Sequence, residues 1–307
     1  MKLLSVVLLL LPLSICLAEV VNDFTESCPG FFANPNHVVS PPTGFSGNRF
    51  RQICQTRNNQ AEFATLYDTE NRIPVYSAYR FTKLMGCKRN DKNKWYIEPQ
   101  LEDGNLWPNM STESAVRKQG VRIVNQAVNA DYSGSRLHKG HLAPVLHANS
   151  QECADATFTL TNAAPQNPSF NSGKWKVTER EMAYVLNTDC TDEGLRAFVV
   201  TGVVPGNNIM NNKVRIPSHF WTAFCCLDNN NQTNCSGAYI GENSNDFAPY
   251  RKSVLDVETE LTQLYGEHFR NIIPFKFQFF DGKCYTETER ARKRKKSGCE
   301  TNKRQKL

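Results

Sequence analysis

Several patterns that define protein classes are absent from these 307 residues. No two cysteines have CxxC spacing, which argues against a zinc site. Beyond the first 18 residues, no apolar run approaches the ~20 residues that span a bilayer, so an integral membrane protein is not expected. No internal repeat and no interdomain linker can be recognised. One continuous domain is therefore the simplest expectation.

The overall composition excludes fibrous and disordered classes. Hydrophobic residues make up 40% of the chain and charged residues 21%, which is ordinary for a globular protein and unlike a collagen, a coiled coil or a disordered chain. The chain is long enough to bury a sizeable core.

The net charge of +6 is unevenly distributed. Residues 290–307 hold nine lysines and arginines and one acid, Glu300, a net of +8, which leaves −2 for residues 1–289. We therefore expect a globular body, residues 19–289, that is not basic. A solvated, disordered tail, residues 290–307, should follow it and bind polyanions.

The first 18 residues predict export. An early cation, Lys2, is followed by an apolar run and by the small residue Ala18, which is the arrangement of a secretory signal peptide cleaved after Ala18. The expected location is extracellular. Cleavage would remove Cys16 and leave ten cysteines, an even number that allows up to five disulfides. Cys225 and Cys226 should take different partners, because a bridge between neighbours distorts the backbone.

Two sequons, at Asn109 and Asn231, predict N-glycosylation of an exported chain. A third, at Asn234, is weaker because Cys235 stands at its middle position. Such tripeptides also arise by chance, so the extracellular expectation rests mainly on the signal peptide.

The residue pattern predicts an α+β domain. Strands are expected at residues 71–82, 158–161, 197–204, 214–227 and 273–280, with Pro217 weakening the fourth. Helices are expected at residues 113–129, 172–187 and 256–266. Residues 19–67 are rich in Pro, Asn and Gly and predict loops with short extended pieces. Strands and helices do not alternate regularly, which argues against a parallel βαβ sheet.

The segment HKGHLAP, residues 138–144, concentrates side chains that can carry chemistry. Gly140 and Pro144 flank His141 and shape the backbone that presents its imidazole. An imidazole with an unperturbed pKa of about 6.5 suits a general base at neutral pH. A zinc site on His138, His141 and His147 is an alternative, although their spacings match neither a helical HExxH motif nor a zinc finger.

Asn171 stands where the helix at residues 172–187 should begin. An asparagine there can cap the helix, and its amide oxygen can also hold a hard cation such as Mg²⁺. Within the helix, Glu179 shares one face with Trp175, Met182 and Leu186. A carboxylate on a face that should be buried is costly unless it is paired or faces a charged site. The alternative is a position at the rim, paired with a lysine.

The motifs YRxT, GHxAP, LTNxxPQ and FNxGxW, followed by a glutamate, resemble the DNA/RNA non-specific endonucleases of the ββα-metal class. The resemblance covers roughly residues 71–280. The SAYRFTK and HKGHLAP versions are most similar to vertebrate endonuclease domain-containing 1-like secreted proteins. The resemblance implies a central antiparallel sheet flanked by helices, with a ββα-metal unit of strand, loop and helix that holds the metal.

The resemblance also implies roles for individual residues. His141 would be the general base that activates water, Asn171 the direct protein ligand of Mg²⁺, and Glu179 a residue that holds waters of the metal. Arg80 would bind the phosphate, and Asn162 matches a further active-site asparagine. Mn²⁺ or Ca²⁺ could replace Mg²⁺. The implied substrate is DNA or RNA, cleaved with little sequence specificity because none of these contacts reads a base.

The chain departs from the usual family motif DRGH, because it has HKGH. Lys139 keeps a charge that can bind substrate phosphate but lacks the forked donors of arginine, and His138 replaces an acid. Two other functions therefore stay open. One is a catalytically weak or inactive nuclease-fold protein that binds nucleic acid or another polyanion, and the other is a phosphodiesterase of small nucleotides. The preference for DNA or RNA and the oligomeric state are also open.

Overall fold

A computed structural model describes residues 19–89, 94–269 and 274–294. The expected signal peptide and residues 295–307 of the basic tail lie outside this part. The centre of the molecule is an antiparallel sheet in the order β1-β2-β3-β4-β7-β8-β9-β10. Its strands are Val20–Val21, Phe50–Arg57, Gln60–Asp68, Ile73–Phe81, Arg196–Met210, Val214–Leu227, Thr233–Glu242 and Tyr250–Lys252.

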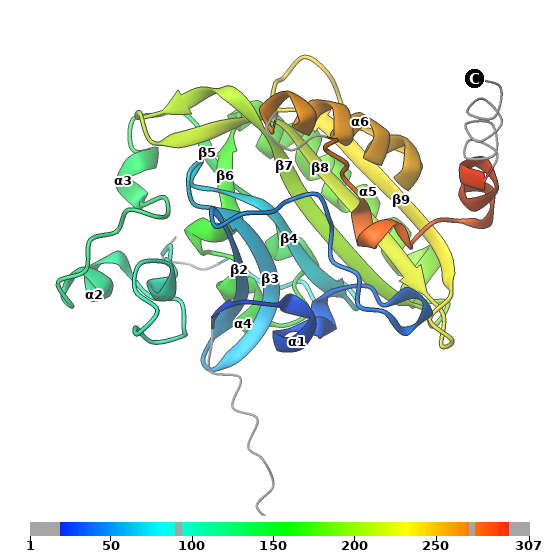
Figure 1. Cartoon of the computed structure of the whole chain (residues 1–307), viewed down its shortest axis with the longest axis horizontal. Helices are drawn as coiled ribbons and strands as arrows, with labels where there is room; N and C mark the ends of the chain where they lie inside the picture. The colour runs from blue at the N-terminus through cyan, green and yellow to red at the C-terminus, as the bar shows by residue number, and fades with distance from the viewer. Residues whose placement is uncertain (1–18, 90–93, 270–273, 295–307) are drawn as a thin grey trace, which may run out of the picture.

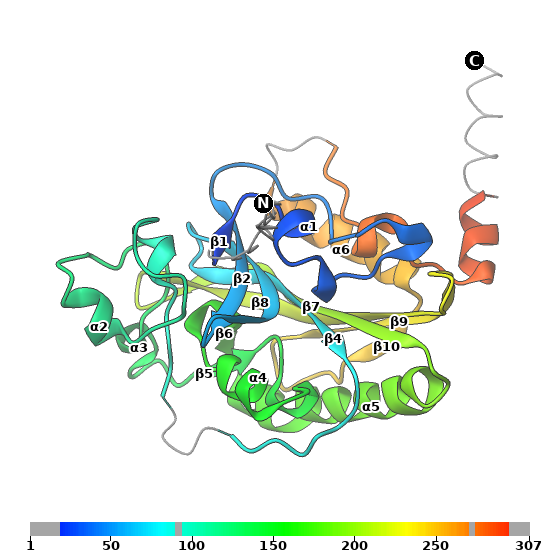
Figure 2. The same ribbon diagram turned by 90° about the horizontal axis from the view of Figure 1, so that it is seen from below.

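The sheet separates two layers (Figures 1 and 2). One layer contains α1 (Phe24–Ser27) and α6 (Val254–His268). The other contains α4 (Gln151–Ala156), α5 (Lys176–Leu186) and a two-stranded sheet. The two strands of that small sheet are β5 (His138–His141) and β6 (Ala163–Gln166). The expected α+β class with a central antiparallel sheet is confirmed.

Two asparagine pairs make the tight turns of the large sheet. Asn58 and Asn59 join β2 to β3 with φ of 50° and 62°, and Asn211 and Asn212 join β7 to β8 with φ of 48° and 56°. Asparagine tolerates this left-handed backbone, which matches the twist of hairpin strands. The prediction that residues 19–67 form loops with short extended pieces was therefore wrong for the second half of this segment, where β2 and β3 are strands of eight and nine residues.

Pro217 does not end the strand in which it lies. It pairs with Pro205 at a register shift between β7 and β8, the kind of bulge at which a sheet tolerates proline. The strands predicted at residues 71–82, 197–204 and 214–227 and the helix at residues 256–266 are all present as β4, β7, β8 and α6.

Three other predicted elements differ from the structure. The helix expected at residues 113–129 is reduced to α2 (Glu113–Arg117) and the single turn α3 (Asn129–Tyr132). Gly120, with φ of +78°, adopts a left-handed conformation soon after α2. The strand expected at residues 158–161 makes only one bridge, from Thr159 to Tyr96, and then turns.

The strand expected at residues 273–280 is also absent from the described residues 274–280, and residue 273 lies outside them. Phe275, Phe277 and Phe279 instead pack in the core between the sheet and α6. Apolar packing thus overrides strand pairing here, since Gln278 alone bridges to Thr43.

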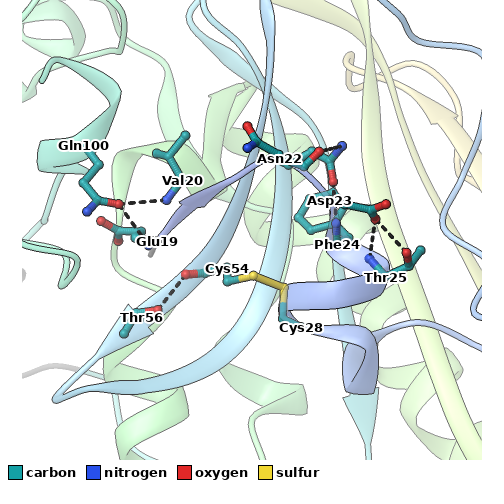
Figure 3. Close-up of a disulfide and its surroundings, with 11 residues drawn as sticks. Glu19, Val20, Asn22, Asp23, Phe24, Thr25, Cys28, Cys54, Thr56 and Gln100 are labelled. Carbon is teal, nitrogen blue, oxygen red and sulfur yellow. Dashed lines mark hydrogen bonds between the residues drawn. A yellow bond between two sulfur atoms is a disulfide. The ribbon is translucent and has the colours of Figure 1, made fainter. Parts of the chain in front are cut away.

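Cys225 and Cys226 point to opposite faces of β8, because side chains alternate along a strand. They bind Cys284 and Cys190 respectively, so the expectation of different partners is confirmed. A third disulfide joins the end of α1 to β2 through Cys28 and Cys54 (Figure 3). Of the other expected cysteines, three are unpaired in the described structure and Cys299 lies outside it; the three are Cys87, Cys153 and Cys235.

The start of the basic tail belongs to the folded body. Residues 287–294 are helical. Arg290 donates to the carbonyl of Tyr285, Lys293 donates to the Tyr285 hydroxyl, and Arg292 forms an ion pair with Asp256 at 3.0 Å. The expected boundary at residue 290 is therefore too early, and only residues 295–307 remain candidates for a solvated tail.

The two predicted glycosylation sites differ in accessibility. The Asn231 side chain is buried, and its amide lies 2.6 Å from His37 Nδ1 while its oxygen accepts from Arg196. A glycan on Asn231 would have to break these contacts. Asn109 is half-buried and bonds to Asn59. Asn234, the weaker sequon, is the exposed one.

None of the described helices has the length and apolar character needed to cross a bilayer.

Candidate active site

The ββα unit gathers the predicted residues from three parts of the chain. β5 pairs with β6 so that His138 lies opposite Gln166 and His141 opposite Ala163. After β6 the chain enters a helical run made of the π-helical turns η6 (Phe170–Trp175), α5 and the π-helical turns η7 (Asn187–Thr191). The helix predicted at residues 172–187 is therefore present and extends further at both ends.

Gly140 permits the close pairing of the two strands. A Cβ atom at this position would lie 2.2 Å from Gln166 Oε1 and 2.7 Å from Gln166 Cβ. Gln166 is buried and cannot swing away into solvent. The glycine of the GH pair is thus needed for β5 to approach β6 and to present His141.

Asn171 does not cap the helix, contrary to one of its two expected roles. Asn167 does so instead, since its Oδ1 accepts from the backbone N–H groups of Ser169 and Phe170 at 3.0 and 3.1 Å. The Asn171 side chain is free of the backbone, and its Nδ2 donates to His138 Nδ1 at 3.3 Å. No described residue donates to its Oδ1, which leaves that oxygen available as a ligand.

His141 is buried between two aromatic rings. Its ring centroid lies 4.9 Å from those of Trp95 and Phe158, and the residue is 9% exposed. Burial, together with the positive charge of Arg89, lowers the pKa of the imidazole to about 3. His141 Nε2 is buried and has no hydrogen-bond partner among the described residues. The imidazole is therefore neutral at pH 7, and this nitrogen is unpartnered and enclosed by protein atoms.

Glu179 projects from α5 into the same region. Burial raises the pKa of its carboxyl to about 8, and the positive charges of Arg89 and Lys176 oppose this shift. Arg89 thus acts on both His141 and Glu179, and its guanidinium lies 5.2 Å from the centre of the Phe158 ring. The expected inward carboxylate is present, beside buried Trp175, Met182 and Leu186.

His147 has a structural role. Its Nε2 donates to the carbonyl of Glu179 at 2.9 Å, so its Nδ1 accepts from the Tyr79 hydroxyl at 2.8 Å. These bonds tie the turn of α5 that carries Glu179 to β4. Both nitrogens are occupied, and no group of three His, Cys, Asp or Glu side chains in the described residues could hold a metal. The structure therefore does not support the zinc alternative.

Asn162 is fully buried and acts as an internal support. Its Oδ1 accepts from Ser77 Oγ and from the N–H of Ala143, and its Nδ2 donates to the carbonyls of Ala143 and Thr157. Every polar atom of this side chain is used. Asn162 therefore fixes the segment after His141 against β4 and is a positioning residue that substrate cannot reach.

Lys139 lies in the wall of an open groove of about 530 Å³. Its Nζ donates to Asn129 Oδ1 at 2.5 Å and lies 5.1 Å from the Trp95 ring centroid. Burial lowers the pKa of its ammonium, and the charge of Glu113 opposes this shift. This surface, called the catalytic groove below, includes Arg89, Trp95, Asn129, Tyr132, His138, Lys139 and Asn171, whereas His141 and Glu179 are not among its lining residues.

The structure does not bring Arg80 to this groove. Tyr79 and Phe81 pack in the cluster on the α5 side of the sheet, whereas Tyr76 and Ala78 pack on the α6 side. Side chains alternate along β4, so Arg80 shares the face of Tyr76 and Ala78. It is exposed there, away from His141 and Glu179.

Four residues of the groove were not predicted from the sequence, namely Arg89, Trp95, Asn129 and Tyr132. Arg89 and Trp95 lie in a polar, irregular segment that carries no periodicity and no motif. Only the tertiary fold brings this loop against β5 and Phe158. No local signal could have found either residue.

A profile of the DNA/RNA non-specific endonuclease family matches residues 44–269. The chain belongs to this family. Among individual relatives, the human protein "Endonuclease domain-containing 1 protein" is 34% identical over 205 residues, which are 65% of this chain and 38% of the relative. The chain thus matches less than half the length of that relative.

Mitochondrial endonuclease G from human is 33% identical over 115 residues, 33% of this chain and 37% of the relative. A solved structure of the EndoG/EndoGI complex, described as showing the mechanism of EndoG inhibition, matches with a TM-score of 0.49 and 20% identity. That match covers 78% of this chain and 88% of the other.

Proposed function

We propose that this protein is an exported endonuclease that uses a divalent metal, Mg²⁺ by preference, to hydrolyse phosphodiester bonds of DNA or RNA with little sequence specificity. The observation that carries the proposal is the neutral, buried imidazole of His141, whose Nε2 has no partner among the described residues, on the same ββα unit as Asn171 and Glu179. Membership of the non-specific endonuclease family supports it.

The oxygen donors of the site fit a hard cation. Asn171 Oδ1 and the Glu179 carboxylate are the ligand types that Mg²⁺ prefers. Asn171 and Glu179 would hold the metal and its waters. When bound, the metal would stabilise negative charge on the phosphate and on the leaving oxygen.

The chain's own residues supply the remaining steps. The His141 imidazole takes the proton of the attacking water, and its ring packs between Trp95 and Phe158. Arg89 supplies forked donors for the phosphate, and Lys139 a second positive charge. Arg80 is left out because it lies on the other face of the sheet. These proposed contacts are to phosphate and water, and none of them reads the edge of a base. Low sequence specificity is therefore expected.

The second candidate is a catalytically weak protein that binds polyanions. The bond between His138 and Asn171 favours it, because it engages the proposed metal ligand with the residue that departs from the usual DRGH motif. The two candidate functions share one fold and differ in activity.

Digestion of plasmid DNA and single-stranded RNA with Mg²⁺, with and without a chelator, tests the proposal. Wild type should cleave both, and His141→Ala should lose at least 100-fold in rate, the typical contribution of general acid–base catalysis. His37→Ala, a histidine change far from the groove, is the matched control. Equal cleavage by wild type and His141→Ala would rule out the proposal, and salt-sensitive binding with no cleavage would select the second candidate.

A further inference from the structure

A second cavity, of about 300 Å³, lies next to the catalytic groove and has no role in the chemistry described above. Four cations line it, Arg72, Arg117, Arg122 and Lys213, with Asp131 as the one carboxylate among its lining residues. We call it the arginine cavity. The body of the protein is not basic, so this concentration of positive charge is a local feature.

The single turn α3 forms the wall between the two surfaces. Asn129 and Tyr132 line the catalytic groove, whereas Val128 and Asp131 line the arginine cavity. α2 and α3 lie at the end of the molecule beside β5 and β6 (Figure 1). A helical turn of four residues is only ~6 Å long, so the two surfaces are neighbours.

Three of the four cations keep an uncompensated charge. Arg72 donates to the carbonyls of Val124 and Lys213 at 2.9 and 3.3 Å, which fixes its guanidinium without neutralising it. Arg117 and Arg122 are exposed and make no ion pair with any described residue. Lys213 is paired with Asp131 at 3.1 Å. The forked guanidinium donors of arginine match the geometry of phosphate.

We propose that the arginine cavity binds a backbone phosphate of the nucleic acid whose scissile phosphate occupies the catalytic groove. The proposal rests on the nuclease function and extends it, because it assigns a polymeric substrate. Phosphates along one strand of a duplex follow every ~3.4 Å of helix axis, so a strand that crosses α3 places a phosphate at the cavity within a few nucleotides. A small phosphodiester reaches only the catalytic groove.

The test is the double variant Arg117→Glu/Arg122→Glu. Its matched control is Arg51→Glu/Lys276→Glu, which changes the net charge equally at two exposed positions outside both surfaces. Binding of a duplex DNA is measured over a salt series with chelator present, so that no cleavage occurs. The cavity variant should bind at least tenfold more weakly, and the salt slope should fall by roughly 0.9 for each DNA phosphate that the variant no longer neutralises.

Cleavage distinguishes a cavity effect from damage to the catalytic groove. For the cavity variant, kcat/KM on duplex DNA should fall far more than kcat/KM on a small chromogenic phosphodiester. Equal losses on both substrates, or DNA binding equal to that of the control, would overturn the proposal. So would inorganic phosphate that binds the cavity without competing with DNA.

The binding experiment separates this proposal from the nuclease function. If wild type binds DNA through the cavity but cleaves nothing, the cavity proposal is supported and the nuclease function is ruled out. If wild type cleaves and the cavity variant matches its control, the nuclease function stands and the cavity proposal fails.

Discussion

The residue that most shapes the chemistry of this site is Arg89, because its charge acts on His141 and on Glu179 together. A cation in this position favours an unprotonated imidazole and an ionised carboxylate at the same time. Burial still raises the pKa of Glu179 to about 8, so the ionised carboxylate that metal binding requires depends on Arg89 and on the charge of the bound cation. The irregular loop before Trp95 therefore contributes as much to the site as the HKGH motif does.

Arg89→Ala and Arg80→Ala form a matched pair of substitutions. We expect Arg89→Ala to reduce the rate of DNA cleavage by at least 10-fold, since phosphate loses its forked donor. Arg80→Ala should stay within 2-fold of wild type, because its side chain lies on the other face of the sheet. Initial rates on plasmid DNA with Mg²⁺ give the comparison. A larger loss for Arg80→Ala would contradict this placement.

Glu258, which lies outside the active site, should make the stability of the protein depend on pH. It is buried, accepts from the Phe279 N–H and the Tyr285 hydroxyl, and burial raises its pKa from 4.5 to about 7. The folded state therefore holds this proton more tightly than the unfolded state. The contribution of Glu258 to the free energy of unfolding is therefore full below pH 4.5. It falls as the pH rises towards 7, by roughly 3 kcal/mol in all.

Glu258→Gln keeps one accepting oxygen for the Phe279 N–H, places an amide NH2 that can donate to the Tyr285 hydroxyl oxygen, and removes the titration. Denaturant unfolding at pH 5 and pH 8 should show a smaller loss of stability in Glu258→Gln than in wild type. Identical pH dependence in the two proteins would mean that Glu258 is not the group responsible.

At the scale of elements, the site depends on how closely β5 pairs with β6. Gly140→Ala would place a methyl group against Gln166, which is buried and has no room to move. The strands must separate, and His141 would shift relative to Asn171 and Glu179. Misplacement of about 1 Å can cost 100-fold in rate.

We therefore expect Gly140→Ala to lose most of its nuclease activity and to unfold at a lower temperature. Gly173→Ala is the control, because a Cβ there meets no atom within 4 Å. Kinetics and thermal unfolding of both variants provide the measurement. Full activity in Gly140→Ala would show that the pairing tolerates the added methyl group.

At the scale of the whole molecule, charge is divided between a nearly neutral body and its C-terminal end. Arg290, Arg292 and Lys293 are held by the body. Residues 295–307 carry five further cations and one acid. Long-range attraction of nucleic acid by net charge should therefore come from residues 295–307, whereas contact at short range should come from the arginine cavity and the catalytic groove.

Truncation after residue 294 tests this division. The affinity for duplex DNA should fall and its salt dependence should weaken, while hydrolysis of a small phosphodiester in the catalytic groove is retained. Truncation after Glu289 serves as a comparison, because it also removes the Arg292–Asp256 ion pair and should lower the unfolding temperature. Unchanged DNA affinity after the first truncation would refute a role for the tail.

The sequence by itself determined the residues that carry local signals. The GH pair, Asn171 and the inward Glu179 were visible because strand and helix periodicities and motif spacing are local properties. The different partners of Cys225 and Cys226 followed from backbone geometry in the same way. These features need no knowledge of distant contacts.

Only the tertiary structure decided which groups meet across the chain. Arg89 and Trp95 come to His141 through long-range packing. Asn162 is enclosed by four hydrogen bonds from three segments. Arg80 points to the other face of the sheet because of its position in β4. The arginine cavity likewise joins α2, α3 and the β7–β8 turn. Contacts between residues far apart in sequence depend on sheet register and burial, which a local pattern does not encode.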